Sequence, residues 1–175
     1  NITGLWILQR LMSEWKTRGE EQSYDTLIPQ AAEATIASII PVDDALFMNP
    51  VNMENALMDY CRQHDLPVPQ NKAEMVKCVL QSLAFKYKQA VEKLNRCLPS
   101  PIRQLNIIGG GSQNKLLNQL TADALSIPVY AGPVEATAIG NILTQAMAKG
   151  EISDLHELRE IVRHSITPQV YHPKK

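Results

Sequence analysis

Three consecutive glycines at positions 109–111 are the residues of this sequence best suited to hold a ligand. They follow the apolar pair Ile107-Ile108 and precede Ser112 and Asn114, so the pattern predicts a short buried strand, a glycine loop and then a helix. A loop without side chains lets the backbone approach a bound molecule closely. The free N–H groups at the start of the following helix favour a polar or anionic partner. This layout is typical of a nucleotide site.

The loop matches neither of two common nucleotide-binding motifs. A dinucleotide fingerprint G-x-G-x-x-G would need a glycine where Asn114 stands, and the G-K-[ST] ending of a P-loop is absent. A tight turn is the alternative, but three glycines exceed what a turn needs, which favours close approach of a ligand. Ser112 is most simply a helix cap. Asn114 either points its amide at a ligand or satisfies the first turn of the helix.

The two acids near this motif, Asp123 and Glu135, have no evident catalytic partner. A lone acid at a helix start usually complements the helix dipole or caps the helix. The sequence contains no paired carboxylates suited to acid–base work, no Ser/His/Asp set and no cysteines or histidines at metal-ligand spacing. It therefore predicts ligand binding, with no catalytic or metal-binding residue.

The elements that must position the loop follow from hydrophobic spacing and from caps. Strands are predicted at 105–108 and 127–131, with the helix 115–125 between them, which is the pattern of a parallel βαβ unit. The polar tail from Thr167 is expected to fray. Ser153 is predicted to cap the last helix and Gly150 to close the one before it. The other predicted helices span 2–18, 24–37, 52–65, 72–97, 134–149 and 153–165.

The longest predicted helix, 72–97, carries one continuous apolar stripe that should face the core. Its members recur at helical spacing: Val76, Val79, Leu80, Leu83, Tyr87, Ala90, Val91 and Leu94.

The chain has 175 residues, enough for one domain or most of one. Its 17 basic and 18 acidic residues give a net charge of −1, so no basic surface for nucleic acid is indicated. No run is long and apolar enough to cross a membrane, and no signal peptide is present. Three cysteines suit a reducing cytoplasm; a bridge between Cys61 and Cys78 is the less favoured alternative to free thiols.

Two strands are too few to form an independent sheet beneath so many helices. Because the chain also starts at Asn1, directly before an apolar helical pattern, we expect a piece of a larger protein whose missing N-terminal part holds further strands. The uncovered sheet edge and apolar surface would then favour self-association of the isolated chain.

The residues around the two glycine turns resemble the C-terminal domain of the FGGY carbohydrate kinases. The resemblance covers essentially the whole chain and is most specific at 1–9 and 107–141, where Gly109-Gly110-Gly111-Ser112, Ala122-Asp123 and Glu135-Ala136 stand. It implies an α/β fold: the helix-rich C-terminal lobe of an actin-like, ribonuclease-H-like two-lobed sugar kinase, with a truncated sheet. Residues 1–175 would then be one partial nucleotide-binding domain.

The resemblance also implies a reaction and its site residues. Within the family, the run Gly132-Pro133-Val134 favours the branch that transfers phosphate from Mg²⁺-ATP to L-rhamnulose in the cytoplasm. The ATP contacts carried over are Asn1, Gln9 and Gly110, with Asn114 near the adenine and with Gly109 and Gly111 shaping the same loop. The catalytic aspartate, the sugar site and the phosphate-binding loop would all lie before Asn1, on the missing N-terminal lobe.

Alternatives remain open on the sequence alone. The sugar-selecting residues would lie outside the chain, so another FGGY kinase, acting on L-fuculose, xylulose or glycerol, is the nearest rival. A helical interaction module that merely uses a glycine turn is a rival of a different class. Asn1 and Gln9 lie a little over two helical turns apart, and without the resemblance they would be interpreted as solvated amides.

Overall fold

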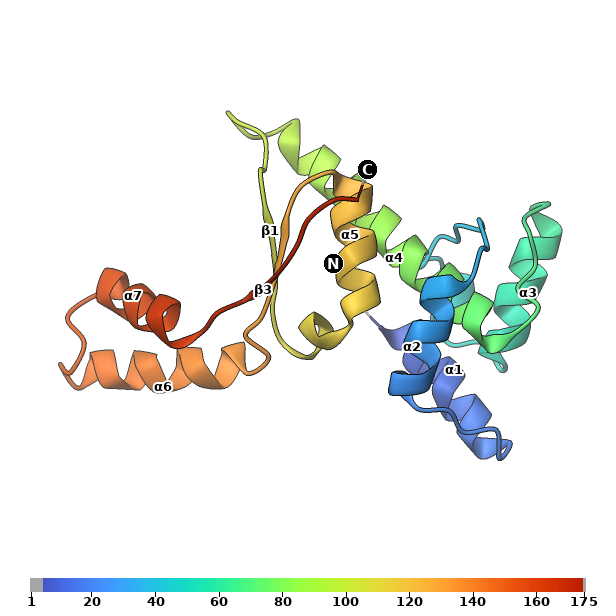
Figure 1. Ribbon diagram of the computed structural model, residues 1–175, viewed down its shortest axis with the longest axis horizontal. Coiled ribbons are helices and arrows are strands. Elements are labelled where there is room, and N and C mark those ends of the chain that lie inside the picture. The colour runs from blue at the N-terminus through green and yellow to red at the C-terminus, as the bar shows by residue number, and fades with distance from the viewer. Residues whose placement is uncertain (1–4, 175) are drawn as a thin grey trace.

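The computed structural model describes residues 5–174, which form a helical cluster, a small central sheet and a projecting pair of helices (Figure 1). Most predicted helices are confirmed to within a few residues. The described elements, in chain order, are α1 (Trp6–Thr17), α2 (Tyr24–Glu33), the 3-10 helix η1 (Ala45–Phe47), α3 (Met53–Gln63), α4 (Lys72–Asn95), β1 (Leu105–Ile107), the 3-10 helix η2 (Gly110–Gln113), α5 (Lys115–Leu125), β2 (Val129–Ala131), α6 (Ala136–Ala148), α7 (Leu155–Ser165) and β3 (Gln169–Tyr171).

The larger hydrophobic core lies among α1–α4. Trp15 of α1, Leu57 of α3 and Leu80 of α4 are all fully buried there. Side-chain caps begin three of these four helices: Ser23 accepts from the Thr26 N–H, Asn52 from the Asn55 N–H and Asn71 from the Glu74 N–H. Each cap satisfies a backbone donor that the helix leaves unpaired, which fixes where the helix starts.

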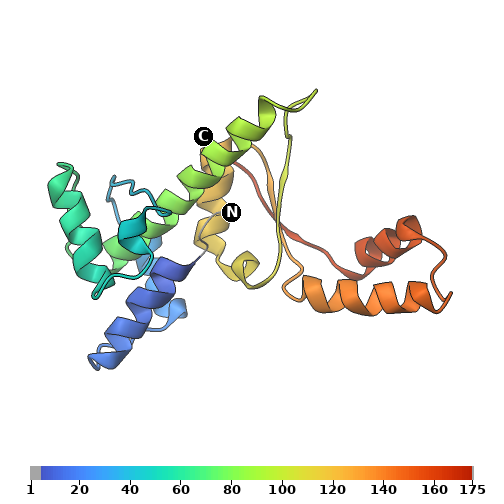
Figure 2. The same ribbon diagram turned by 180° about the vertical axis from the view of Figure 1, so that it is seen from behind.

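The apolar stripe of α4 is only half buried, so its prediction as a continuous core stripe is wrong. Val76 and Leu83 have no exposed surface, whereas Leu94 is 54% exposed. The N-terminal half of α4 packs in the helical cluster, and the C-terminal half passes beside β1 and α5 (Figure 2). The second half therefore presents an apolar face that the described residues leave uncovered.

The sheet has the strand order β1-β2-β3. β1 and β2 run parallel, with Leu105 beside Val129 and Ile107 beside Ala131, and α5 connects them, so the predicted βαβ unit is confirmed. β3 pairs antiparallel with β2. β1 is an edge strand among the described residues, and its free edge leaves backbone groups available for pairing.

The predicted fraying of the C-terminal tail is wrong, because the tail forms β3 and is anchored on α5. Tyr171 is only 8% exposed and packs on a small second core with Ala122 and Val129. The Asp123 carboxylate accepts from the Lys174 backbone N–H at 2.7 Å and from Gln119 Nε2 at 2.8 Å. Asp123 therefore has a structural role.

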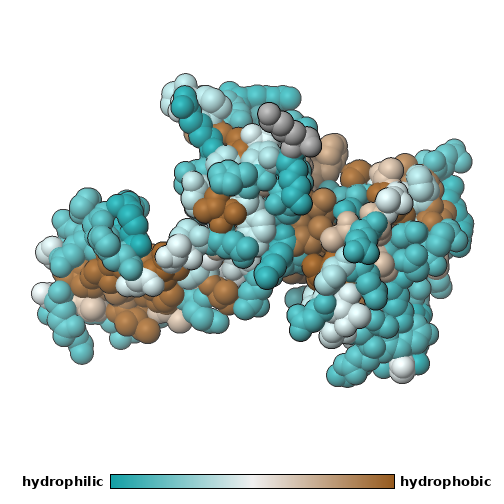
Figure 3. Space-filling model, viewed as in Figure 1, coloured by the Kyte–Doolittle hydropathy of each residue, from teal (hydrophilic) through white to brown (hydrophobic). Residues whose placement is uncertain are grey.

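Helices α6 and α7 form an arm that projects from the sheet and packs chiefly on itself (Figure 1). Neither helix contains a buried residue, and Ile142 of α6 is 66% exposed. Hydrophobic side chains gather along this arm in the space-filling view (Figure 3). Asp154, and not the predicted Ser153, caps α7 by accepting from the Glu157 N–H. Within residues 5–174, no helix combines the length and apolar character needed to cross a membrane.

The three cysteines are free thiols. Cys61 and Cys78 are both buried, and a hydrogen bond between their thiols raises the pKa of Cys78, as does burial. Cys97 is exposed. The interpretation of Cys61 and Cys78 as ordinary buried thiols therefore holds in this structure.

Leu83→Ala is expected to destabilise the chain by about 2–5 kcal/mol, because it empties a fully buried position in the α1–α4 core. Val51→Ala is the matched control, since Val51 is 100% exposed, and should change stability by less than about 0.5 kcal/mol. The free energy of unfolding in urea, measured on the chain and both variants, checks this. Equal effects of the two variants would contradict the assignment of the core.

Candidate functional site

The glycine loop is held in place where the two parallel strands end. The Gly109 N–H donates to the Pro133 carbonyl at 2.9 Å, and the Gly132 N–H donates to the Ile107 carbonyl at 2.8 Å. These two bonds tie the end of β1 to the turn that follows β2. Gly109 has a φ of +74°, a left-handed conformation that a side chain would strain.

A 3-10 turn, η2, follows Gly109 and is fixed by side-chain hydrogen bonds. The Ser112 hydroxyl donates to the Gly109 carbonyl at 2.7 Å, and Asn118 Nδ2 donates to the Ser112 carbonyl at 2.8 Å. Ser112 therefore braces the loop and does not cap α5, contrary to the prediction. A Cβ built on Gly110 or Gly111 would meet no described atom within 4 Å, so these two glycines border open space.

Asn114 caps the first turn of α5, which is one of the two alternatives that the sequence left open. Its Oδ1 accepts from the Leu117 N–H at 3.0 Å and so caps α5. This bond fixes the orientation of the amide, and the Nδ2 donor then has no partner among the described residues. Asn114 is only 9% exposed, and a buried donor without an acceptor is costly. The start of α5 therefore holds one buried amide donor that the described residues leave unsatisfied.

Asn114 lies in a hollow of about 240 Å³ between the start of α5 and one side of α2. The residues that line it are Tyr24, Asp25, Ile28, Pro29, Gln113, Asn114 and Lys115. The sequence did not indicate that α2 contributes to this site. The signal available in the sequence was an aromatic residue, Tyr24, directly after the helix cap Ser23. The structure shows that Tyr24 is exposed.

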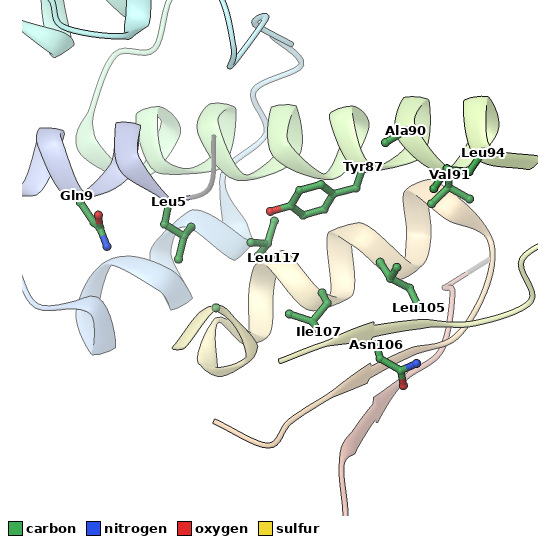
Figure 4. A pocket seen from close by; sticks show the side chains of 11 residues that line it. Leu5, Gln9, Tyr87, Ala90, Val91, Leu94, Leu105, Asn106, Ile107 and Leu117 are labelled. Atoms are coloured by element: carbon green, nitrogen blue, oxygen red, sulfur yellow. The ribbon is translucent and has the colours of Figure 1, made fainter. Parts of the chain in front are cut away.

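Gln9 and Gly111 line a second, larger space, a groove of about 560 Å³. The groove runs between α4, β1 and the start of α1, and its remaining lining is mostly apolar (Figure 4). Tyr87 stands at its centre, and burial raises the pKa of this phenol. The groove is lined by Leu5, Gln9, Tyr87, Ala90, Val91, Leu94, Leu105, Asn106, Ile107, Gly111 and Leu117. Among the predicted site residues, Asn1 lies outside the described residues.

The described part of the chain offers no base with an orienting partner near this loop. Asp123 is engaged by the C-terminal tail, and Glu135 makes no capping hydrogen bond at the start of α6. His64 and His164 each face a backbone carbonyl of the preceding helical turn. No group of three or more His, Cys, Asp or Glu residues is placed to hold a metal ion in residues 5–174.

Comparison with known proteins relates the sequence of this chain to one family. A model of the C-terminal domain of the FGGY family of carbohydrate kinases matches residues 1–149. The chain belongs to this family. The FGGY relatives include proteins named rhamnulokinase from Bacteroides thetaiotaomicron (45% identical), Pectobacterium atrosepticum (46%) and Bacillus subtilis (38%). In each case 99% of this chain is covered, together with 35%, 34% and 36% of the relative.

The chain thus spans about a third of the length of these FGGY relatives. Its fold is also similar to that of xylulose kinase from Rhodospirillum rubrum, with a TM-score of 0.61 at 15% identity, covering 96% of this chain and 33% of that one. The predicted actin-like sugar-kinase fold, helix-rich and with a small sheet, is confirmed.

Proposed function

We propose that this chain is the ATP-binding part of a kinase that phosphorylates L-rhamnulose to L-rhamnulose 1-phosphate in L-rhamnose catabolism. The observation that carries the proposal is the 38–46% identity to proteins named rhamnulokinase along 99% of the chain. The open glycine loop and the unpaired Asn114 donor support a bound nucleotide at the same place. The three free thiols suit the cytoplasm.

The loop 109–114 fits the nucleoside end of ATP. Gly110 and Gly111 leave space against the backbone, and Asn114 Nδ2 supplies a donor for a base nitrogen. Gln9 lines the groove that Gly111 also lines, and its amide is proposed to contact the same nucleotide. Asn1 is proposed for the same role from the family resemblance. Mg²⁺ would neutralise phosphate charge, and it would be held chiefly by the phosphates and by residues beyond this chain.

The rest of the protein is proposed to supply the catalytic base, the sugar site and the phosphate-binding loop. In phosphoryl transfer, the sugar hydroxyl attacks the γ-phosphorus, ADP leaves, and the hydroxyl proton passes to the base. The free edge of β1 and the apolar half of α4 mark where additional strands would pair and pack. The same uncovered surfaces would promote self-association of the isolated chain, which stays a prediction.

Phosphorylation by the full-length protein tests the proposal. With Mg²⁺-ATP, we expect kcat/KM for L-rhamnulose to exceed the values for L-fuculose, xylulose and glycerol by at least about 100-fold, because mispaired sugar hydroxyls leave buried polar groups unsatisfied. A preference for another of these sugars would assign the protein to a different branch of the family. The absence of ATP-dependent phosphorylation of all four would overturn the kinase assignment.

A further inference from the structure

The three glycines of the loop have no side chains that could fix its shape. Gly110 and Gly111 lie between Gly109 and Ser112, and glycine has the greatest conformational freedom of any residue. Ser112 closes the loop on itself, because its backbone N–H and its hydroxyl both donate to the Gly109 carbonyl, at 3.0 Å and 2.7 Å. The shape of the loop therefore depends on what holds Ser112 in place.

Asn118 holds Ser112 from the first turn of α5. Its Nδ2 donates to the Ser112 carbonyl at 2.8 Å. Asn118 has no exposed surface, and the neighbouring residues Leu117 and Thr121 of the same helix are also buried. A side chain that is packed on all sides has few other conformations, so this hydrogen bond ties the loop to a rigid helix.

Asn118 is a costly residue for this position if stability alone is considered. Its Oδ1 is buried and accepts no hydrogen bond from the described residues. A buried polar atom without a partner lowers stability, and an apolar side chain would avoid that cost. Local violations of this kind are expected at functional sites, and this one lies directly behind the glycine loop.

We propose that Asn118 is a positioning residue for ATP, which acts through Ser112 to hold the glycine loop in the shape that the nucleotide contacts. Asn118 has no exposed surface, so its effect on the nucleotide passes through the loop. A loop that is already held in its bound shape loses less conformational entropy when the ligand binds, and its affinity is higher for that reason. The inference rests on the proposed function, since the loop 109–114 is the proposed nucleotide site.

Kinetics of the full-length protein test this role. Asn118→Ala is expected to raise the KM and the calorimetric dissociation constant for ATP by about tenfold, because one hydrogen bond is lost and the loop is freed. The kcat at saturating ATP and the KM for L-rhamnulose should stay as in the wild type, since the lost interaction serves only ATP binding. A merely structural role would lower kcat through loss of folded protein and leave both KM values unchanged.

Thr121→Ala is the matched control. Thr121 is also fully buried on α5 and donates one hydrogen bond, at 2.7 Å, but the acceptor is the Leu117 carbonyl within the helix. This variant should lower the melting temperature as Asn118→Ala does, with the KM for ATP unchanged.

Ser112→Ala tests the same link without emptying a position in α5. It removes the hydroxyl bond to the Gly109 carbonyl and should also raise the KM for ATP. Because Asn118 and Ser112 act through one chain of hydrogen bonds, the double variant should lose less affinity than the product of the two single effects.

The variants separate this inference from the proposed function. An unchanged KM for ATP in both Asn118→Ala and Ser112→Ala, with Gly110→Val still weakening ATP binding, would overturn the inference and leave the proposed function standing. An equal rise in Thr121→Ala would also overturn it, because the effect would then come from lost packing in the helix. ATP affinity that none of these variants changes, Gly110→Val included, would count against the proposed nucleotide site itself.

Discussion

The purified 175-residue chain, mixed with Mg²⁺-ATP and L-rhamnulose, is expected to form no L-rhamnulose 1-phosphate above background. Its described residues hold neither a base with an orienting partner near the glycine loop nor a cluster suited to a metal ion. A positioned general base alone contributes roughly 10²–10⁴-fold to a rate, and transfer also needs charge stabilisation around the moving phosphoryl group. Coupled detection of ADP, with sugar phosphate confirmed by mass spectrometry, is the measurement.

Two controls make this result interpretable. The full-length protein, assayed at the same molar concentration, shows that the conditions permit turnover, and a cooperative thermal transition shows that the chain is folded. Turnover that co-purifies with the chain and is abolished by Gly110→Val within it would contradict the proposed division of roles. Turnover insensitive to that substitution would come from a contaminant.

The Gly110→Val variant of the full-length protein is expected to bind ATP about 10- to 100-fold more weakly. The substitution is expected to cause neither backbone strain nor a clash within the chain. Gly110 is not in the left-handed region, and a Cβ there meets no described atom within 4 Å. The added side chain should therefore leave the fold intact and occupy only space that the nucleotide needs. Overpacking of this kind costs about 1–3 kcal/mol. Calorimetry gives the dissociation constant.

A graded series separates this steric effect from loss of structure. Gly110→Ala should show a smaller loss of affinity than Gly110→Val, and both should melt as the wild type does. Gly109→Val is the contrasting variant: its φ of +74° predicts a lowered melting temperature. A side chain would strain the backbone at Gly109, which has the positive φ, and not at Gly110. Wild-type ATP affinity in Gly110→Val would separate this loop from the nucleotide.

Helix caps and apolar spacing predicted most of the helices. Most errors concern features that depend on contacts between segments far apart in the sequence. Helix α5 begins and ends as predicted, because Asn114 caps it and apolar spacing fills its length. Strand β3 was missed because three residues carry little periodicity and form a strand only through pairing with β2. Helical spacing located the apolar residues of α4 but wrongly predicted that all of them are buried. Spacing along one helix cannot show how far the neighbouring elements extend, so the exposure of Leu94 was not predictable.

The sequence predicted the glycine loop of the candidate site but not the residues of α2 that line the hollow beside it. The glycines and Asn114 were recognisable because their residue types and spacing have few other uses. Gln9 was identified only through the family resemblance, and the structure places it with Gly111 along one groove. Tyr24 and Asp25 were missed because they reach the hollow through the packing of α2 against α5, which is a tertiary contact.

Photolabelling of the full-length protein with 8-azido-ATP, followed by peptide mapping, tests the central claim most directly. The azide sits on the base, so the label should attach to residues around the hollow, within 24–29 and 110–115, and excess ATP should suppress it. Labelling that ATP suppresses but that lies wholly outside these two segments would contradict the placement of the nucleotide on this chain.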